Sequence, residues 1–221
     1  ETYGRFHCEP LERGFGLTIG NALRRILLSS IRGAAITNIS IDGTLHEFST
    51  IPDVVEDVAD IILNLKEVQL RMHSLGPKVI RIEKDSEGSI CAGDIICDES
   101  VEILNPEQHI ATVASGGKFS AELVVREGCG YVPAEANKNE HAPEGTIAID
   151  SIFSPIRRVN FKVTNARVGQ RTDYDKLTLE VWTNGAILPE DSVALASKIL
   201  KEQLQIFINF DEAIEEPVEE V

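Results

Sequence analysis

Basic residues are scarce in this sequence. Its 21 lysines and arginines stand against 36 acidic residues, which gives a formal net charge of −15 over 221 residues. Proteins that bind nucleic acid on their own usually carry a basic excess or a basic stripe, and this chain has neither. Any contact with DNA is therefore expected to be indirect, through other proteins.

Long apolar runs are missing as well. No stretch of 18 apolar residues occurs, so no membrane-spanning helix is predicted, and no signal peptide is visible. Apolar residues nevertheless make up 43% of the chain, which is enough for a packed core. We predict a cytoplasmic protein with one large domain or two small ones. Because the first residue is Glu1 rather than Met, we expect a few native residues to precede it.

Metal-binding motifs are also lacking. The four cysteines form no CxxC pair, and none of the five histidines belongs to an HExxH motif. A chain of this length with a real core does not need disulfides, so the cysteines are predicted to be reduced thiols. The sequence predicts no metal and no cofactor.

Two short stretches are candidates for chemistry. Gly14, Gly16 and Gly20 lead into a predicted helix, where a glycine-rich turn can hold a phosphate. Their spacing is not GxGxxG and no Walker lysine follows, so a tight turn with close packing is the favoured interpretation. Cys129 is a possible nucleophile, but no histidine lies close in sequence to act as its base. No catalytic residue is predicted.

The start of the chain reads as a strand followed by a helix. Residues 3–11 alternate weakly and contain Pro10, which is typical of a strand at a sheet edge. A helix is predicted from about Thr18 to a stop at Arg32-Gly33. Its apolar positions have helical spacing and are Ile19, Ala22, Leu23, Ile26 and Leu27.

The end of the chain reads as two strands and a long helix. Residues 157–183 alternate as two antiparallel strands joined by QRTDYD, and Pro189 opens a helix that is expected to reach about Phe210. This helix is apolar over most of its circumference, so we expect more than one packing partner, and its own sheet and a second copy of the chain are the candidates. Residues 211–221 hold six acids and no base, which predicts a solvated linker.

The middle of the chain has a different sequence pattern, with short β-rich runs and many turn residues. Residues 34–50 are predicted to form a hairpin around Asp42-Gly43, and a second helix is expected to begin near Pro52 with an apolar stripe that includes Val54. Short β-rich runs then alternate with turn residues as far as residue 155. We predict an α+β fold in which a mostly β domain, residues 33–155, is inserted into a domain made of residues 1–32 and 156–210.

Leu28 of the first predicted helix lies on the polar face, opposite the apolar stripe. On a helical wheel with Ile19 at zero, the apolar stripe centres near Ile19 and Ile26, whereas Leu28 falls at about 180°. Its neighbours on the wheel are Asn21, Arg24 and Arg25. A single exposed leucine is common and needs no explanation. An apolar centre with flanking arginines is also the usual composition of a protein–protein hot spot, and the wheel alone leaves both interpretations open.

Several long motifs resemble the bacterial RNA polymerase alpha subunit family. They match in order and cover nearly the whole chain: LERGFGLTIGNALRRILLSS (11–30), IDGTLHEFST (41–50), ILNLK (62–66), GYVPA (130–134), SPIRRVNFKV (154–163), ARVGQRTDYDKL (166–177) and TNGAILPEDSVALASKIL (183–200). The resemblance is to the amino-terminal portion of the family. The resemblance does not extend to the helical carboxy-terminal DNA-binding domain of the family, and we expect the acidic residues after Asp211 to be the start of the linker to it.

The resemblance implies a homodimer that serves as an assembly scaffold for the beta and beta-prime subunits of the polymerase. It implies that Arg25 and Leu28, with Arg24, contact beta and that Lys176 contacts beta-prime. The helices of the outer domain would pack against their copies through Ile26, Leu27, Leu200, Leu204 and Phe207. The competing hypothesis is a small enzyme that uses Cys129 or the glycine turn. The resemblance favours a non-catalytic subunit of a nucleotidyltransferase complex.

Overall fold

The computed structural model describes residues 2–139, 141–168 and 171–208. Its helices are α1 (Phe15–Ser29), α2 (Val58–Lys66), α3 (Ala134–Asn137), α4 (Pro189–Gln205) and a short 3-10 turn, η1 (Ala92–Asp94). Its strands are β1 (Tyr3–Leu11), β2 (Arg32–Ile41), β3 (Leu70–Met72), β4 (Lys78–Lys84), β5 (Gly88–Cys91), β6 (Ile95–Ile96), β7 (Val101–Ile103), β8 (His109–Val113), β9 (Phe119–Cys129), β10 (Tyr131–Val132), β11 (Thr146–Ala148), β12 (Ser151–Ile152), β13 (Ile156–Val168) and β14 (Arg171–Thr183).

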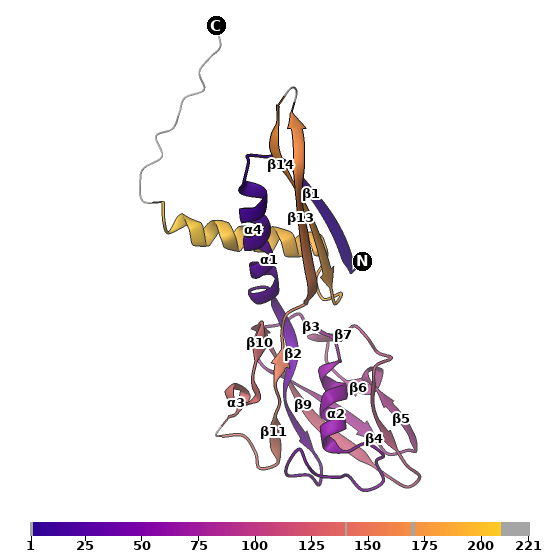
Figure 1. Ribbon diagram of the computed structural model, residues 1–221. Coiled ribbons are helices and arrows are strands. Elements are labelled where there is room, and N and C mark those ends of the chain that lie inside the picture. The colour runs from indigo at the N-terminus through magenta and orange to yellow at the C-terminus, as the bar shows by residue number, and fades with distance from the viewer. Residues whose placement is uncertain (1, 140, 169–170, 209–221) are drawn as a thin grey trace.

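The first body is built from the two ends of the chain. A three-stranded antiparallel sheet has the order β1-β14-β13, so β1 is an edge strand as its proline predicts. Helix α1 packs against β13 and β14, and α4 crosses α1 (Figure 1). Their shared core contains Leu23 and Leu27 of α1, Leu179 and Val181 of β14, and Ala196 of α4.

The second body is built from the middle of the chain. A seven-stranded sheet runs in the order β6-β4-β9-β2-β3-β7, with β11 added beside β2. The helix α2 contacts β2 and β8, and β8 pairs with β5. The core of this body extends from Ile36 to Ile149 and shares no buried residue with the first core. The α+β class with an inserted, mostly β domain is confirmed, while the exact boundaries stay a prediction.

The predicted hairpin at 34–50 is wrong. The Asp42-Gly43 turn forms, since Gly43 has a φ of 80° and the Thr44 amide donates to Ile41 O at 3.1 Å. The chain does not return along β2, however, because β2 pairs with β9, β11 and β3 instead. Residues 44–50 therefore form turns rather than a strand.

Three predicted boundaries also need correction. Helix α2 begins at Val58, because the Asp57 side chain accepts from the Asp60 amide at 2.8 Å and caps the helix there. Helix α4 ends at Gln205, short of the predicted end. Strand β14 already begins at Arg171, so most of the predicted QRTDYD connection is strand. The predicted linker at 211–221 lies outside the described residues.

Candidate interaction surface

The start of α1 is capped by a carboxylate from the sheet. Gly14 precedes the helix with a φ of 93° and offers no side chain, so the first amides of the helix need an outside acceptor. Asp175 Oδ2 accepts from the Gly14 amide at 2.9 Å and from the Gly16 amide at 3.1 Å. The glycine turn is thus occupied by the chain's own carboxylate, as the favoured interpretation of a structural turn requires.

Removing this cap should destabilise the outer domain. Hydrogen bonds to a charged group contribute about 1.5–3 kcal/mol, so we expect Asp175→Ala to lower the free energy of unfolding by about 2 kcal/mol. Asp175→Asn keeps one acceptor oxygen and should lose less. Urea unfolding followed by circular dichroism measures both variants, and equal stability of Asp175→Ala and the wild type would contradict the capping role.

Glycines set which face of α1 is buried. A Cβ on Gly16 would lie 2.8 Å from Val163 Cγ1, and one on Gly20 would lie 2.6 Å from the Phe161 ring. The helix therefore approaches the sheet through Gly16 and Gly20, with Leu23 and Leu27 buried beside them. The buried face is thus rotated from the predicted stripe, whose other members, Ile19, Ala22 and Ile26, are only half-buried.

The face of α1 opposite Ile19 and Ile26 carries more apolar surface than predicted. Leu28 is 38% exposed and Leu17 is 60% exposed. Leu17, Arg24 and Leu28 are separated by seven and then four residues, so they share one stripe. Arg24 and Arg25 are exposed, and within the described residues neither guanidinium makes an ion pair. The stripe is an apolar surface with arginines at its margin, and Leu17 is a member that the helical wheel of apolar positions did not indicate.

The residues expected at the dimer contact on α1 differ in exposure. Leu27 is completely buried in the core of its own chain, so it has no surface left for a second copy. Leu27 is therefore a core residue of its own chain and not a dimer contact, which corrects the prediction. Ile26 is half-buried, as are Ile19 and Ala22 on the same side of the helix, and Phe15 beyond them is exposed. This second apolar side of α1 remains available to a partner.

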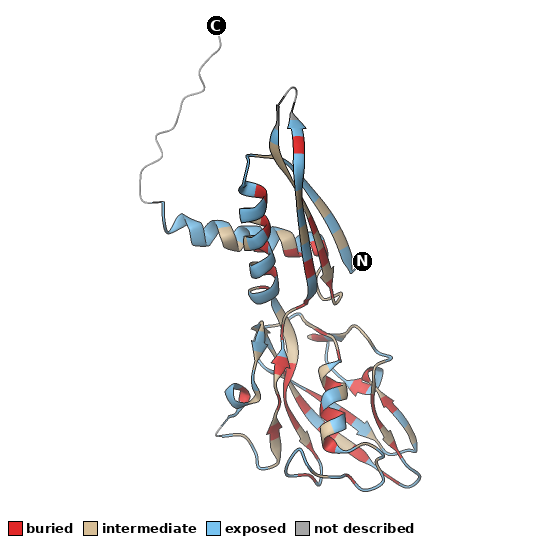
Figure 2. Cartoon of the chain, viewed as in Figure 1, coloured by how far each residue is buried: buried red, intermediate tan, exposed pale blue. Residues whose placement is uncertain are grey.

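Helix α4 continues its buried stripe beyond the chain's own core. Ala196 is fully buried and Leu200 is half-buried, whereas Leu204, four residues further, is 53% exposed. Phe207 lies just past the end of the helix and is 81% exposed. Figure 2 shows the change along α4 from buried residues near the sheet to exposed ones toward the end of the helix. The last turns present an apolar face that no described residue covers.

Lys176 lies on the far side of the sheet from α1. Its Nζ pairs with Glu9 Oε1 of the edge strand at 2.6 Å. Further along this side of the sheet, Tyr3 and Asn160 both donate to Glu180 and hold the pKa of that carboxyl below its usual range. Lys176 and the Leu28 stripe therefore belong to different surfaces of the outer domain.

A polar cluster in the inserted domain had no sequence signal. Glu56 Oε1 lies 2.8 Å from His109 Nε2, and Ser89 Oγ lies 3.0 Å from His109 Nδ1. The Thr112 amide donates to Glu56 Oε2 at 2.6 Å. Burial raises the pKa of Glu56, but the hydrogen bonds from His109 and Thr112 outweigh it, so the pKa is lowered overall. The cluster ties the loop before α2 to β8.

The Glu56 contacts predict an acid-sensitive contribution to stability. A lowered pKa in the folded state means that the contribution is complete above the unfolded value of about 4.3 and is lost as the pH falls through the folded pKa. We expect Glu56→Gln to cost about 1–3 kcal/mol at pH 7. The difference from the wild type should shrink below about pH 4. Thermal unfolding of the wild type and Glu56→Gln at pH 7 and below about pH 4 tests this prediction. A stability difference between the two proteins that is the same at both pH values would contradict it.

Cys129, the other candidate for chemistry, has no side chain that could act as its base within hydrogen-bonding distance among the described residues. Cys129 is exposed, and its thiol lies 3.6 Å from the carbonyl oxygen of Ser30. All four cysteines are free thiols. Among the described residues, no group of three histidine, cysteine or acidic side chains is arranged to hold a metal, and no helix is long and apolar enough to cross a membrane.

Comparisons with a family model and with known relatives point to the same protein family. Residues 39–154 match the family described as the RNA polymerase Rpb3/RpoA insert domain. Three relatives are all called DNA-directed RNA polymerase subunit alpha. The one from Geobacter metallireducens is 62% identical over 219 residues, which cover 99% of this chain and 64% of the relative. The relative from Symbiobacterium thermophilum is 60% identical (97% and 68% covered), and that from Moorella thermoacetica 58% (99% and 70%).

The extent of these matches decides the family. The chain spans about two thirds of the length of the three relatives. The insert-domain match covers more than half of the chain, and the relatives extend the similarity to nearly all of it. The chain therefore belongs to the bacterial DNA-directed RNA polymerase alpha subunit family.

Proposed function

We propose that the chain is an assembly subunit of bacterial RNA polymerase, which forms a homodimer and holds the beta and beta-prime subunits. The observation that carries this proposal is unburied apolar surface on two helices of the outer domain. Leu204 and Phe207 of the α4 segment, and Phe15 of α1, are at least half exposed. Large exposed apolar patches usually mark interaction sites. A second copy would cover this surface.

The beta contact is assigned to the stripe on the other side of α1. Arg25 and Leu28, with Arg24 beside them, combine an exposed leucine with two guanidinium groups that make no ion pair within the described part of the chain. Arginine around a desolvated apolar centre is typical of interface hot spots. Because this stripe and the half-buried side with Ile26 occupy different parts of the helix circumference, one α1 can face a second copy and beta at once.

The beta-prime contact is assigned to the surface that carries Lys176. An incoming carboxylate would compete there with Glu9 for the lysine. In this proposal the chain supplies no catalytic group, reaches DNA only through the assembled enzyme and acts in the cytoplasm. Residues 33–155 form the inserted domain, and the outer domain holds the subunit contacts.

The enzyme hypothesis has less support. A phosphate at the glycine turn would have to displace Asp175, which already accepts from two amides there. For Cys129, the thiol contact is a backbone carbonyl and not a base. Rapid, selective alkylation of Cys129 or measurable nucleotide binding would revive this alternative.

The oligomeric state tests the proposal at its first step. Light scattering of the purified chain should give twice the 24.3 kDa mass of one chain. The mass should remain at that value on dilution to low micromolar concentration. A monomer throughout the range would contradict the proposal, because a scaffold for two different subunits needs two copies.

A further inference from the structure

The two domains are joined by a narrow double connection. Ile31 leads from the outer domain into β2, and Pro155 leads from the inserted domain back into β13. The two connections touch, because a Cβ on Gly33 would overlap the carbonyl oxygen of Phe153. Two adjacent connections define one hinge, so a contact away from them is needed to fix the angle between the domains.

Arg71 provides such a contact. It lies on β3 of the inserted domain, and its Nε donates to the carbonyl oxygen of Ala186 at 3.0 Å. Its Nη2 donates to the carbonyl oxygen of Gly185, and its Nη1 donates to Glu102 Oε2 at 3.1 Å. Gly185 and Ala186 belong to the turn between β14 and α4. One guanidinium thus joins two backbone carbonyls of the outer domain to a carboxylate of the inserted domain.

Gln69 adds a second bridge beside Arg71. With the amide oriented so that both ends find partners, its nitrogen donates to the carbonyl oxygen of Asn184 at 2.7 Å. Its oxygen accepts from Arg157 Nη2 at 2.6 Å. The Asn184 amide in turn donates to the carbonyl oxygen of Pro155 at 2.9 Å. The turn is therefore held both by β3 and by the returning connection.

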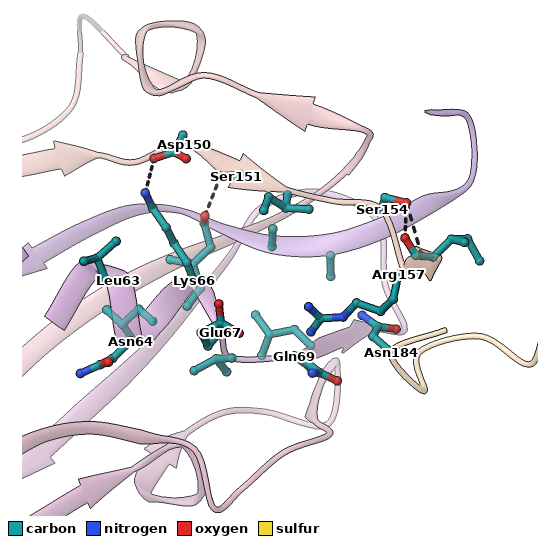
Figure 3. A pocket seen from close by; sticks show the side chains of 18 residues that line it. Leu63, Asn64, Lys66, Glu67, Gln69, Asp150, Ser151, Ser154, Arg157 and Asn184 are labelled. Carbon is teal, nitrogen blue, oxygen red and sulfur yellow. Dashed lines mark hydrogen bonds and ion pairs between the residues drawn. The ribbon is translucent and has the colours of Figure 1, made fainter. Parts of the chain in front are cut away.

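The Gln69 contacts lie at one end of a cavity of about 530 Å³, which is lined mainly by the inserted domain and by Ile156, Arg157 and Asn184 of the outer domain (Figure 3). Gln69, Arg157 and Asn184 lie together at this end, and the ion pair of Lys66 with Asp150 lies at the other. The space between them is not filled by side chains, so this part of the junction lacks close packing. Here the polar contacts of Arg71 and Gln69 can supply rigidity.

We propose that Arg71 and Gln69 are positioning residues, an interdomain clamp that fixes the orientation of the inserted domain on the outer domain. The clamp as such does not depend on the proposed function; its consequence for subunit capture does. A partner that touches both domains binds more weakly to a hinged pair, because binding must then also order the hinge.

Distance measurement between spin labels tests the clamp directly. Cys8 on β1 and Cys97 after β6 are exposed and lie in different domains, so they serve as label sites once Cys91 and Cys129 are replaced by serine. Dilution with unlabelled chain removes distances between copies. The clamped protein should give one narrow distance distribution.

The double variant Arg71→Ala, Gln69→Ala should give a broad distribution, and Arg71→Lys, which keeps a donor, should fall between. Arg81→Ala is the matched control, because its ion pair with Glu122 at 2.9 Å lies within the inserted domain. Unchanged circular dichroism shows that both domains stay folded. A narrow, unshifted distribution in the double variant would overturn the clamp. The distances need no partner, so a failure to bind beta would bear on the proposed function alone.

Discussion

Replacing Leu204 by glutamate should convert a dimer into a monomer. The side chain is half exposed in the single chain and continues the buried stripe of α4, so a second copy would desolvate it. A carboxylate buried at an apolar contact without a partner costs several kcal/mol. At about 1.4 kcal/mol per tenfold change, we expect the dissociation constant to rise by roughly 100-fold or more. Sedimentation velocity across a concentration series measures the shift.

Two further variants separate dimer loss from misfolding. Gln205→Glu adds the same charge about 100° around α4 from Leu204, where the side chain is exposed, and should leave the dimer intact. Leu200→Glu should also give a monomer, but Leu200 packs on the chain's own core, so its unfolding curve has to be compared with that of the wild type. Unchanged sedimentation of both leucine variants would show that the dimer surface lies elsewhere.

Replacing Arg25 by alanine should abolish capture of the beta subunit and keep the dimer. The guanidinium has no partner among the described residues, so its loss should not disturb the fold. Truncation of a hot-spot arginine costs at least about 2 kcal/mol, which is about 30-fold in affinity. Co-purification of tagged chain with beta, followed by quantitative gel analysis, measures the loss.

Matched substitutions make this result specific. Leu28→Ala and Leu17→Ala should weaken capture by removing the apolar part of the same stripe, with a smaller effect at the more peripheral Leu17. Arg5→Ala removes an exposed arginine from β1, on the opposite side of the sheet, and should bind beta normally. Normal capture by Arg25→Ala would remove the assigned contact. A parallel loss in Arg24→Ala would place that arginine in the same contact.

Periodicity predicted the first helix but not its buried face. The apolar stripe around Ile19 and Ile26 correctly indicates a helix. It does not show that Gly16 and Gly20 take half of the buried side, because glycine carries no hydrophobic signal. Close approach to Phe161 and Val163 makes the small residues the contact. The same rotation leaves Leu17 and Leu28 together on the exposed side.

Local patterns were least reliable in the inserted domain. The Asp42-Gly43 turn forms, yet the place beside β2 is taken by β9, which follows about 80 residues later. Similarly, Val54 has helical spacing to Val58, but the Asp57 cap starts α2 after it, and Val54 bridges to Val113. A sequence window does not contain these distant competitors. Long-range pairing therefore overrides the local signal.

The features of the interaction surface also differ in how far the sequence could predict them. The exposure of Arg24, Arg25 and Leu28 could be predicted from the wheel, because it depends only on position within one helix. The roles of Asp175 and Arg71 could not, because each acts on backbone groups more than a hundred residues away in the chain. Their partners become neighbours only through the sheet register and the turn after β14. Neither residue type nor local spacing carries that information.

The stoichiometry of the complex with beta tests the central claim most directly. The tagged chain is co-expressed with beta, purified at physiological salt and analysed by native mass spectrometry. We predict two copies of this chain for one beta subunit. The 2:1 complex should be lost in both Leu204→Glu and Arg25→Ala, but only Leu204→Glu should be monomeric when purified alone. A complex with one copy of the chain for each beta subunit, or no complex at all, would contradict it.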